Sequence, residues 1–254
     1  MVVYIIGTDY RITEDSIVGA SFAHVNGVIK LKNQTVPEDM KIDNNTISIY
    51  SQTDVTNKLY LQGIFSASNS NTKIRRVFNI AGGNHEGKGK LKNTSYNFST
   101  LAGYKAKLSN NGLYFIPTIG LDYGSHKDSK FHEKGLGIYN RNIKANSYNS
   151  LTGNIGAKLA IQKQISQGLA LAPEIHGSIS QDLNIKPRKI QTKLSINDSY
   201  SEVKINNKDK TTYNFGAGMV TKINNKVDIS ATYDLTARKK YQAHQGSLQL
   251  KIYF

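Results

Sequence analysis

Apolar and polar residues alternate one by one along most of this chain, and the pattern is clearest at the C-terminus. There, every second residue is large and apolar: Leu248, Leu250, Ile252 and Phe254. A period of two places successive side chains on opposite faces of a β-strand. We therefore expect a final strand with one apolar and one polar face, which suits a wall between lipid and water.

The same alternation recurs upstream, whereas no comparable stretch sustains the period of a helix. The clearest further segments are residues 113–123, 151–162, 169–180, 213–219 and 227–235, and less regular ones are residues 2–11, 16–31, 45–55, 58–70 and 95–108. Together with the final segment, they predict an all-β chain of roughly eleven strands.

Charged side chains occupy the polar face near the middle of several of these segments. An unpaired charge is costly in a dry protein core, whereas a water-filled interior accepts it. We therefore expect a transmembrane antiparallel β-barrel with a wet lumen, and we assign five residues to that lumen: Lys158, Glu174, His176, Asp228 and Lys251. Glu174 and His176 lie two residues apart and are expected to join a charge network rather than to perform acid–base chemistry.

The connections between the expected strands alternate between short and long. Residues that accept turn geometry form five tight turns, at 13–16, 56–58, 110–112, 166–168 and 224–226. Long polar linkers are expected at about 31–44, 70–94, 125–146, 181–211 and 238–245. Outer-membrane barrels combine short periplasmic turns with long external loops, so we expect all the long linkers outside the cell.

Composition excludes several other classes of protein. The chain has 254 residues, a formal net charge of +15 and a mean hydropathy of −0.45, and it contains no cysteine. No apolar run approaches the roughly 18 residues of a membrane helix, but a barrel gives only every other residue to lipid. Without cysteine there is no disulfide, thiolate nucleophile or Cys-ligated metal. The first residues also lack the features of a signal peptide.

The expected number of strands is odd, whereas single-chain bacterial barrels have an even number. If the last strand ends in the periplasm, the five tight turns are periplasmic and one strand is missing at the N-terminus. We therefore expect residues 1–254 to be an N-terminally truncated twelve-stranded barrel, the C-terminal part of a longer precursor.

Four segments together resemble a known family. They are residues 113–123 (LYFIPTIGLDY), 131–135 (FHEKG), 151–156 (LTGNIG) and 171–173 (LAP), and the chain also ends in an aromatic residue. In the order and spacing of these segments, the sequence is similar to the C-terminal β-domain of autotransporters (type V secretion), above all to those of rickettsial surface antigens. Members have twelve strands and a helix through the pore, so the first strand and the pore helix are expected to be missing here.

The resemblance implies a non-enzymatic translocator of the bacterial outer membrane that anchors an upstream passenger domain and exports it to the cell surface. The implied partners are outer-membrane lipid, the barrel-assembly machinery and the chain's own passenger; no cofactor is implied. The assembly machinery would recognise the C-terminal signal formed by Leu248, Leu250, Ile252 and Phe254.

Other chemical sites are weakly indicated. Residues 82–89 nearly match a phosphate-binding loop, but Gly89 stands where Ser or Thr is needed, so we expect a flexible external loop. The six histidines form no metal-binding spacing, and no nucleophile elbow is present. No helix-turn-helix or RNP-like motif indicates nucleic-acid binding.

Basic residues gather in two of the long linkers and could bind anionic lipids or glycans. The candidate residues are Lys73, Arg75, Arg76, Lys186, Arg188 and Lys189. A solvated charge run is the simpler interpretation of this cluster. Two alternatives to the translocator therefore stay open: an adhesin or porin-like outer-membrane barrel that acts through basic external loops, and a soluble all-β binding module.

Overall fold

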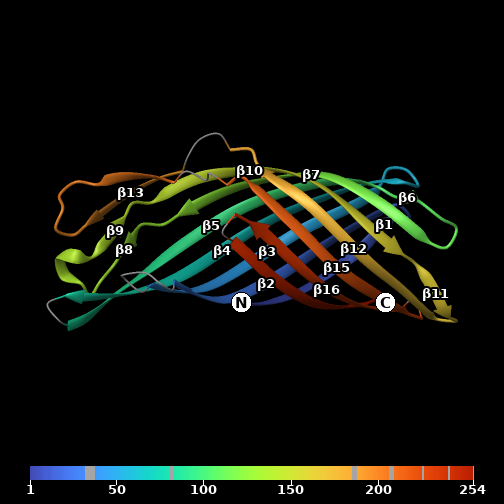
Figure 1. Cartoon of the computed structure of the whole chain (residues 1–254), viewed down its shortest axis with the longest axis horizontal. Coiled ribbons are helices and arrows are strands. Elements are labelled where there is room, and N and C mark those ends of the chain that lie inside the picture. The colour runs from blue at the N-terminus through green and yellow to red at the C-terminus, as the bar shows by residue number, and fades with distance from the viewer. Residues whose placement is uncertain are drawn as a thin grey trace.

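Eleven antiparallel strands follow one another around a single curled sheet (Figure 1). A computed structural model describes residues 1–31, 38–80, 83–184, 188–205, 209–224, 226–239 and 241–253. The strands are β1 (Val2–Thr13), β2 (Ser16–Leu31), β3 (Glu38–Asp54), β4 (Leu59–Ile80), β5 (Gly83–Tyr104), β7 (Leu113–Asp128), β10 (Asn146–Ile161), β12 (Leu169–Asp182), β15 (Thr211–Ile223), β16 (Val227–Arg238) and β17 (Tyr241–Ile252). The predicted fold class, an antiparallel all-β barrel wall of about eleven strands, is confirmed.

Six short strands complete the described structure. Two join the curled sheet: β6 (Ala106–Lys107) pairs with β7, and β11 (Lys163–Ser166) pairs with β12. Four form a second sheet in the order β14 (Ser201–Ile205), β13 (Arg188–Leu194), β9 (Arg141–Ile143) and β8 (Phe131–His132). The 3₁₀ helix η1 (Gly137–Tyr139) lies between β8 and β9. Among the described residues, no helix has the length and apolarity needed to cross a membrane.

The predicted tight turns connect neighbouring strands at one end of the sheet. Three of them contain a residue in the left-handed region of backbone space: Gly112 (φ 80°), Gly168 (φ 87°) and Asn224 (φ 50°). Glycine and asparagine tolerate this conformation better than other residues. At Gly168 a side chain would also collide with Asn224 of the neighbouring turn, so local sequence and packing both specify these turns.

The long connections differ from the prediction. Residues 38–44 belong to β3, residues 70–80 and 83–94 belong to β4 and β5, and only Lys239 and residue 240 separate β16 from β17. The linkers expected at 31–44, 70–94 and 238–245 are therefore wrong within the described residues. The regular alternation ends where the strands leave lipid, because the outward face then meets water instead of lipid, but the backbone ladder continues.

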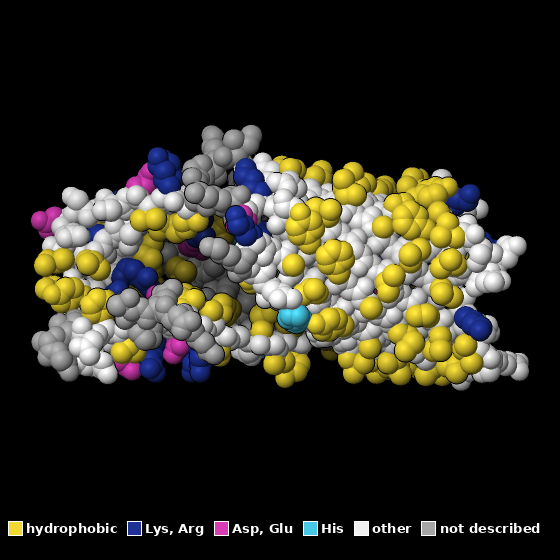
Figure 2. Space-filling view, viewed as in Figure 1, with side chains coloured by type: hydrophobic (Ala, Val, Ile, Leu, Met, Phe, Trp, Pro, Cys, Tyr) yellow, Lys and Arg dark blue, Asp and Glu magenta, His cyan; other side chains and the backbone are white. Residues whose placement is uncertain are grey.

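Large apolar side chains point away from the sheet and form a broad band on its outer surface (Figure 2). Relative exposure reaches 60% at Ile119, 66% at Ile155 and 59% at Ile175. Among the described residues, Ile74, Phe131 and Leu136 are the apolar side chains that are buried. A soluble sandwich would bury such residues between its sheets, so the distribution is that of a membrane barrel.

We define the outer lobe as the second sheet, η1 and the ends of β4 and β5 beyond the apolar band, which lie together at the end opposite the tight turns (Figure 1). Gly87 and Gly89 of β5 lie directly against Glu133 and Phe131, and a side chain at either glycine would collide with them. The flexible loop expected at residues 82–89 is therefore wrong for the described residues 83–89, which form a strand. Its glycines admit a close neighbour.

Candidate functional site

The polar inner face of the sheet holds a network of four ionisable side chains. Lys158 of β10, His176 of β12 and Asp234 of β16 lie in one lateral row, in which Gly216 of β15 stands between His176 and Asp234. His176 Nε2 lies 2.8 Å from Asp234 Oδ1. Glycine makes this contact possible, because a side chain at position 216 would collide with both partners.

Glu174 joins this network from the next inward-facing position of β12. Its carboxylate lies 2.9 Å from Lys158 Nζ and 3.6 Å from His176 Nδ1. Glu174 is largely buried, with 18% of its side chain exposed. The structure thus brings together three of the five residues assigned to the lumen and adds Asp234. The network links β10, β12 and β16 across β15 and keeps the inner face charged.

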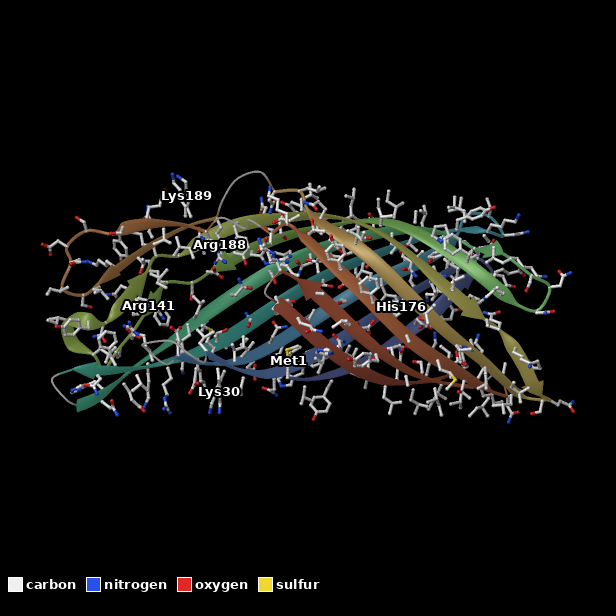
Figure 3. The ribbon with its side chains drawn as sticks, in the orientation of Figure 1. Met1, Lys30, Arg141, His176, Arg188 and Lys189 are labelled. Carbon is white, nitrogen blue, oxygen red and sulfur yellow. The ribbon has the colours of Figure 1, made fainter. Side chains whose placement is uncertain are left out.

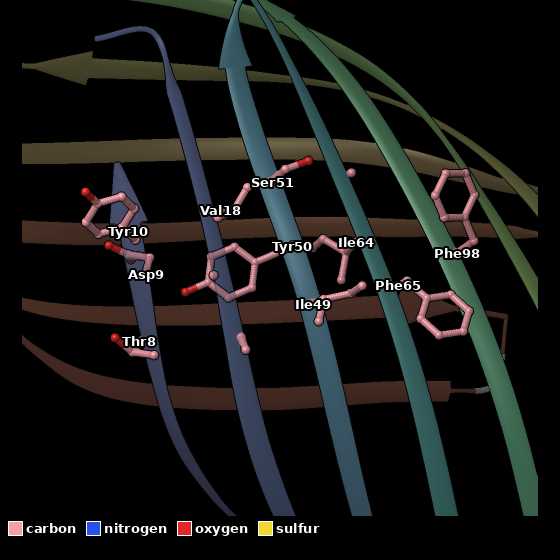
Figure 4. A pocket seen from close by; sticks show the side chains of 13 residues that line it. Thr8, Asp9, Tyr10, Val18, Ile49, Tyr50, Ser51, Ile64, Phe65 and Phe98 are labelled. Carbon is pink, nitrogen blue, oxygen red and sulfur yellow. The ribbon is translucent and has the colours of Figure 1, made fainter. Parts of the chain in front are cut away.

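The other two assigned residues lie on the last two strands, β16 and β17. Lys251 Nζ donates a 2.7 Å hydrogen bond to Asp9 Oδ2 of β1, from which it is 242 residues distant in sequence. Asp228 of β16 accepts a 2.8 Å hydrogen bond from the Tyr253 hydroxyl. Tyr50 of β3 reaches across Gly19 of β2 toward Asp9 (Figure 4). Side chains therefore link the two ends of the curled sheet.

The backbones of β1 and β17 are not paired with each other in the described sheet. Each of the ten steps between neighbouring strands is antiparallel. The first and the last of eleven strands consequently run in the same direction. We call the gap between them the seam, and the pair Lys251–Asp9 spans it.

A second cluster fastens β13 to the barrel wall where the outer lobe begins. Arg188 forms an ion pair with Asp128 at the end of β7, and its guanidinium lies 4.0 Å from the ring centroid of Tyr148. The ring of His126 also stacks on the ring of Tyr148, with 4.7 Å between the ring centroids. Asn93 donates a 2.7 Å hydrogen bond to Asp128. Burial lowers the pKa of His126; the charge of Asp128 opposes this shift, and the charge of Arg188 adds to it.

The third cluster lies inside the outer lobe. Arg76 donates two hydrogen bonds to Glu133, of 3.1 Å from Nε and 2.5 Å from Nη2, and only 1% of the Glu133 side chain is exposed. The backbone N–H of Arg141 donates to the same carboxylate at 2.8 Å, while its guanidinium reaches Glu38 at 3.2 Å. A bidentate pair fixes orientation as well as distance, so this cluster holds β4, β8 and β9 in register.

The basic candidates are divided among these environments rather than gathered on one surface. Arg76 and Arg188 have buried or half-buried carboxylate partners, and Lys189 pairs with Glu202 at 3.1 Å. Arg75 lies 3.5 Å from Glu86, whose pKa is lowered by a hydrogen bond from Lys88 and by the charge of Arg75. Lys73 is exposed, and Lys186 and Phe254 lie outside the described residues.

Sequence patterns gave no signal for several functional partners. Asp9, Asp128 and Arg141 acquire their roles through contacts with distant strands, which periodicity does not specify, and Glu133, although it lies in the segment 131–135 that resembles the family, is not identified by that resemblance as a partner of Arg76. Asp234 stands on the polar face of its segment, but its contact with His176 depends on register across β15. No group of three or more His, Asp or Glu suited to a metal ion occurs among the described residues.

Comparisons with known proteins converge on one family. The profile of the autotransporter beta-domain matches residues 1–234. "Putative surface cell antigen sca1" of Rickettsia conorii is 29% identical over 97% of this chain and 13% of its own length, and "Outer membrane protein A" of the same species is 28% identical over 98% and 12%. The chain thus spans a small part of these relatives.

Two solved structures share the fold. The translocator domain of the autotransporter NalP from Neisseria meningitidis superposes with a TM-score of 0.78 at 19% identity, covering 99% of this chain and 79% of that one. The β-domain of the Bordetella autotransporter BrkA gives a TM-score of 0.62 at 13% identity, covering 98% and 87%.

Proposed function

The chain belongs to the autotransporter β-domain family, and on that premise we propose that it is a translocator of the bacterial outer membrane, which anchors the passenger of a longer protein and exports it to the cell surface. The family match over residues 1–234 is the observation with the greatest weight. The exposed apolar band and the charged inner face support it, because a barrel must meet lipid outside and water within. A stand-alone adhesin or porin-like barrel is not favoured by these matches.

The orientation in the membrane follows from the two ends of the sheet. Short turns are periplasmic and long extensions are external in outer-membrane barrels. The tight turns therefore face the periplasm, and the outer lobe lies outside the cell. The inner-face residues Lys158, Glu174, His176, Asp228 and Lys251 then line the path of the passenger.

One further strand would close the barrel. Because β1 and β17 run in the same direction, antiparallel closure requires a strand of opposite direction between them. Neighbouring strands lie about 4.8 Å apart, so the inserted strand would separate β1 from β17 by roughly 10 Å. An extended lysine and an aspartate can span that distance, as Lys251 and Asp9 do. We assign this twelfth strand to the intact protein, upstream of Val2.

The C-terminal strand offers a surface to an assembly partner. Leu248, Leu250 and Ile252 are 80%, 62% and 49% exposed on the outer face of β17. An unpaired edge with an exposed apolar row suits recognition by strand pairing. We therefore propose that the barrel-assembly machinery recognises this strand.

Surface display of a tagged passenger tests the function. The chain is expressed in a Gram-negative host behind a signal peptide, an epitope tag and an amphipathic twelfth strand, and antibody binding to intact cells is measured. We expect surface labelling and a folded form that migrates faster on a gel before heating. Leu250→Asp, which places a charge in lipid, should abolish both, whereas Gln249→Asp on the inner face should abolish neither. A tag that stays in a soluble periplasmic product would refute the proposal.

A further inference from the structure

The outward face of β2 to β5 changes its chemistry in ordered steps toward the outer lobe. Each step is a lateral row of directly paired residues. The row at the apolar band is Phe22–Ile47–Ala67–Tyr96, the next is His24–Asn45–Asn69–Thr94, the third is Asn26–Asp43–Asn71–Lys92, and the fourth is Val28–Lys41–Lys73–Lys90. The surface thus passes from apolar and aromatic through a neutral polar row and a row that holds both Asp43 and Lys92 to a row with three lysines.

The fourth row lies an even number of residues from the first along each strand, so its side chains are on the same side of the sheet as the lipid-facing residues. Ile74 and Gly89, the neighbours of Lys73 and Lys90, face inward, where Ile74 is buried and Gly89 lies against Phe131. Lys73 and Lys90 therefore point outward, and both are exposed. Lys30, one row farther out, also points away from the ribbon (Figure 3).

The three lysines of the fourth row are direct neighbours of one another. Lys41 is paired with Lys73, and Lys73 with Lys90, so three like charges stand side by side across three strands. Like charges directly opposite each other destabilise a sheet. Among the described residues, none of the three has an ion pair, whereas Arg75 and Lys88 of the next row share Glu86. Asp39 and Asp43 lie two residues from Lys41 on the same face, and Asp43 lies 3.9 Å from His24.

The height of the row matches a thick polar headgroup. The lysines lie six residues beyond Ile47, Ala67 and Tyr96 along their strands. At about 3.3 Å per residue and a tilt of about 40°, this distance corresponds to roughly 15 Å above the edge of the apolar band. The second and third rows lie in this interval, and their amide and hydroxyl side chains (Asn45, Asn69, Thr94, Asn26 and Asn71) suit sugar hydroxyl groups.

From this arrangement we propose that the outward lysine row, Lys41, Lys73 and Lys90 with Lys92 beside it, binds the phosphate groups of a glycolipid in the outer leaflet. The inference rests on the proposed membrane orientation. Lipid is the occupant because the row continues the lipid-facing surface, so that a molecule whose acyl chains cover the apolar band presents its headgroup to the lysines. Bound phosphate removes the repulsion within the row.

Titration of the full chain in detergent micelles tests the site. Bisphosphorylated lipid A is the probe, its dephosphorylated form is the reference, and binding is measured by native mass spectrometry. A Lys near an anionic lipid surface contributes about fivefold in affinity, so K41Q/K73Q/K90Q should bind the probe on the order of a hundredfold more weakly. The matched control K58Q/K107Q/K163Q removes three exposed lysines at the opposite end of the sheet and should bind like the wild type.

A second measurement separates binding from folding. The temperature at which the folded gel band disappears should rise with lipid A in the wild type and stay unchanged by lipid A in K41Q/K73Q/K90Q and in the milder K73Q. Equal binding of phosphorylated and dephosphorylated lipid, or equal loss in the control variant, would overturn the proposal. So would a triple variant that loses heparin binding but keeps lipid A binding. Absence of a folded band from the wild-type protein would count against the proposed barrel.

Discussion

Glu133 gives the sharpest single perturbation of this structure, because its carboxylate is almost fully buried and accepts three hydrogen bonds. Two come from Arg76 and one from the backbone N–H of Arg141. Removing one partner of a buried ion pair costs about 3 to 5 kcal/mol, mainly because the other charge stays buried and unpaired. Arg76 retains 13% exposure and a 3.1 Å hydrogen bond to the carbonyl of Tyr139, so we expect the lower end, about 3 kcal/mol, for Glu133→Gln.

The loss should be confined to the outer lobe, since the cluster fastens β8 and β9 to β4 and does not touch the apolar band. Amide hydrogen exchange of the folded protein measures it, and about 3 kcal/mol corresponds to roughly a hundredfold faster exchange in β8 and β9. Strands β12, β15 and β16 should exchange as in the wild type. Glu86→Gln, which removes an exposed carboxylate with two basic neighbours, should change neither region.

A double variant separates the ion pair from general disturbance. Arg76→Met added to Glu133→Gln removes the charge left unpaired, and the two effects should be strongly non-additive. The reasoning would be refuted if Glu133→Gln left exchange in β8 and β9 unchanged, or if the two substitutions simply added.

Three further predictions concern the inner face, the seam and the cluster around Asp128. Gly216→Val should force His176 away from Asp234 and lower the temperature at which the folded gel band disappears, whereas a substitution that leaves this temperature unchanged would show that the contact contributes nothing. Lys251→Gln should lower the same temperature by loosening the seam, and Lys251→Arg should largely retain it. Because burial lowers the pKa of His126 below its ordinary value of 6.5, the neutral ring is favoured in the fold. Stability from this group is therefore complete above about pH 6.5 and is lost as the pH falls below it. The protection of β13 amides, meaning the intrinsic exchange rate divided by the observed rate at the same pH, should be lower at pH 5.5 than at pH 7.5, and His126→Gln should remove the difference.

The membrane-spanning part of the fold was predictable, because contact with lipid imposes a period of two on the sequence. Segments such as residues 113–123 and 227–235 showed it, and the number of strands and the five tight turns followed. The outer extensions were not predictable from the same signal. The apolar residues of 70–80 (Ile74, Val77, Phe78 and Ile80) do not recur at every second position, and Leu91 is the one large apolar residue of 83–94, so the sequence pattern there does not distinguish a loop from a strand.

The sequence predicted which face of the sheet carries the candidate site residues, but not the contacts among them. Glu174 and His176 had to share a face, since they are two residues apart. The contact of His176 with Asp234 required the register of three strands and the absence of a side chain at Gly216. The lysine row likewise emerged only when β3, β4 and β5 were aligned, because Lys41, Lys73 and Lys90 are far apart in sequence.

The unbroken ladder of β4 and β5 limits how this region can change in length during evolution. Residues pair without interruption from Leu59 with Tyr104 to Ile80 with Gly83. Inserting a single residue in one arm would turn every side chain beyond it to the other face, so that Arg76 would point outward and Lys73 inward. Insertions and deletions that preserve the hairpin should therefore occur as even numbers of residues matched between the two arms.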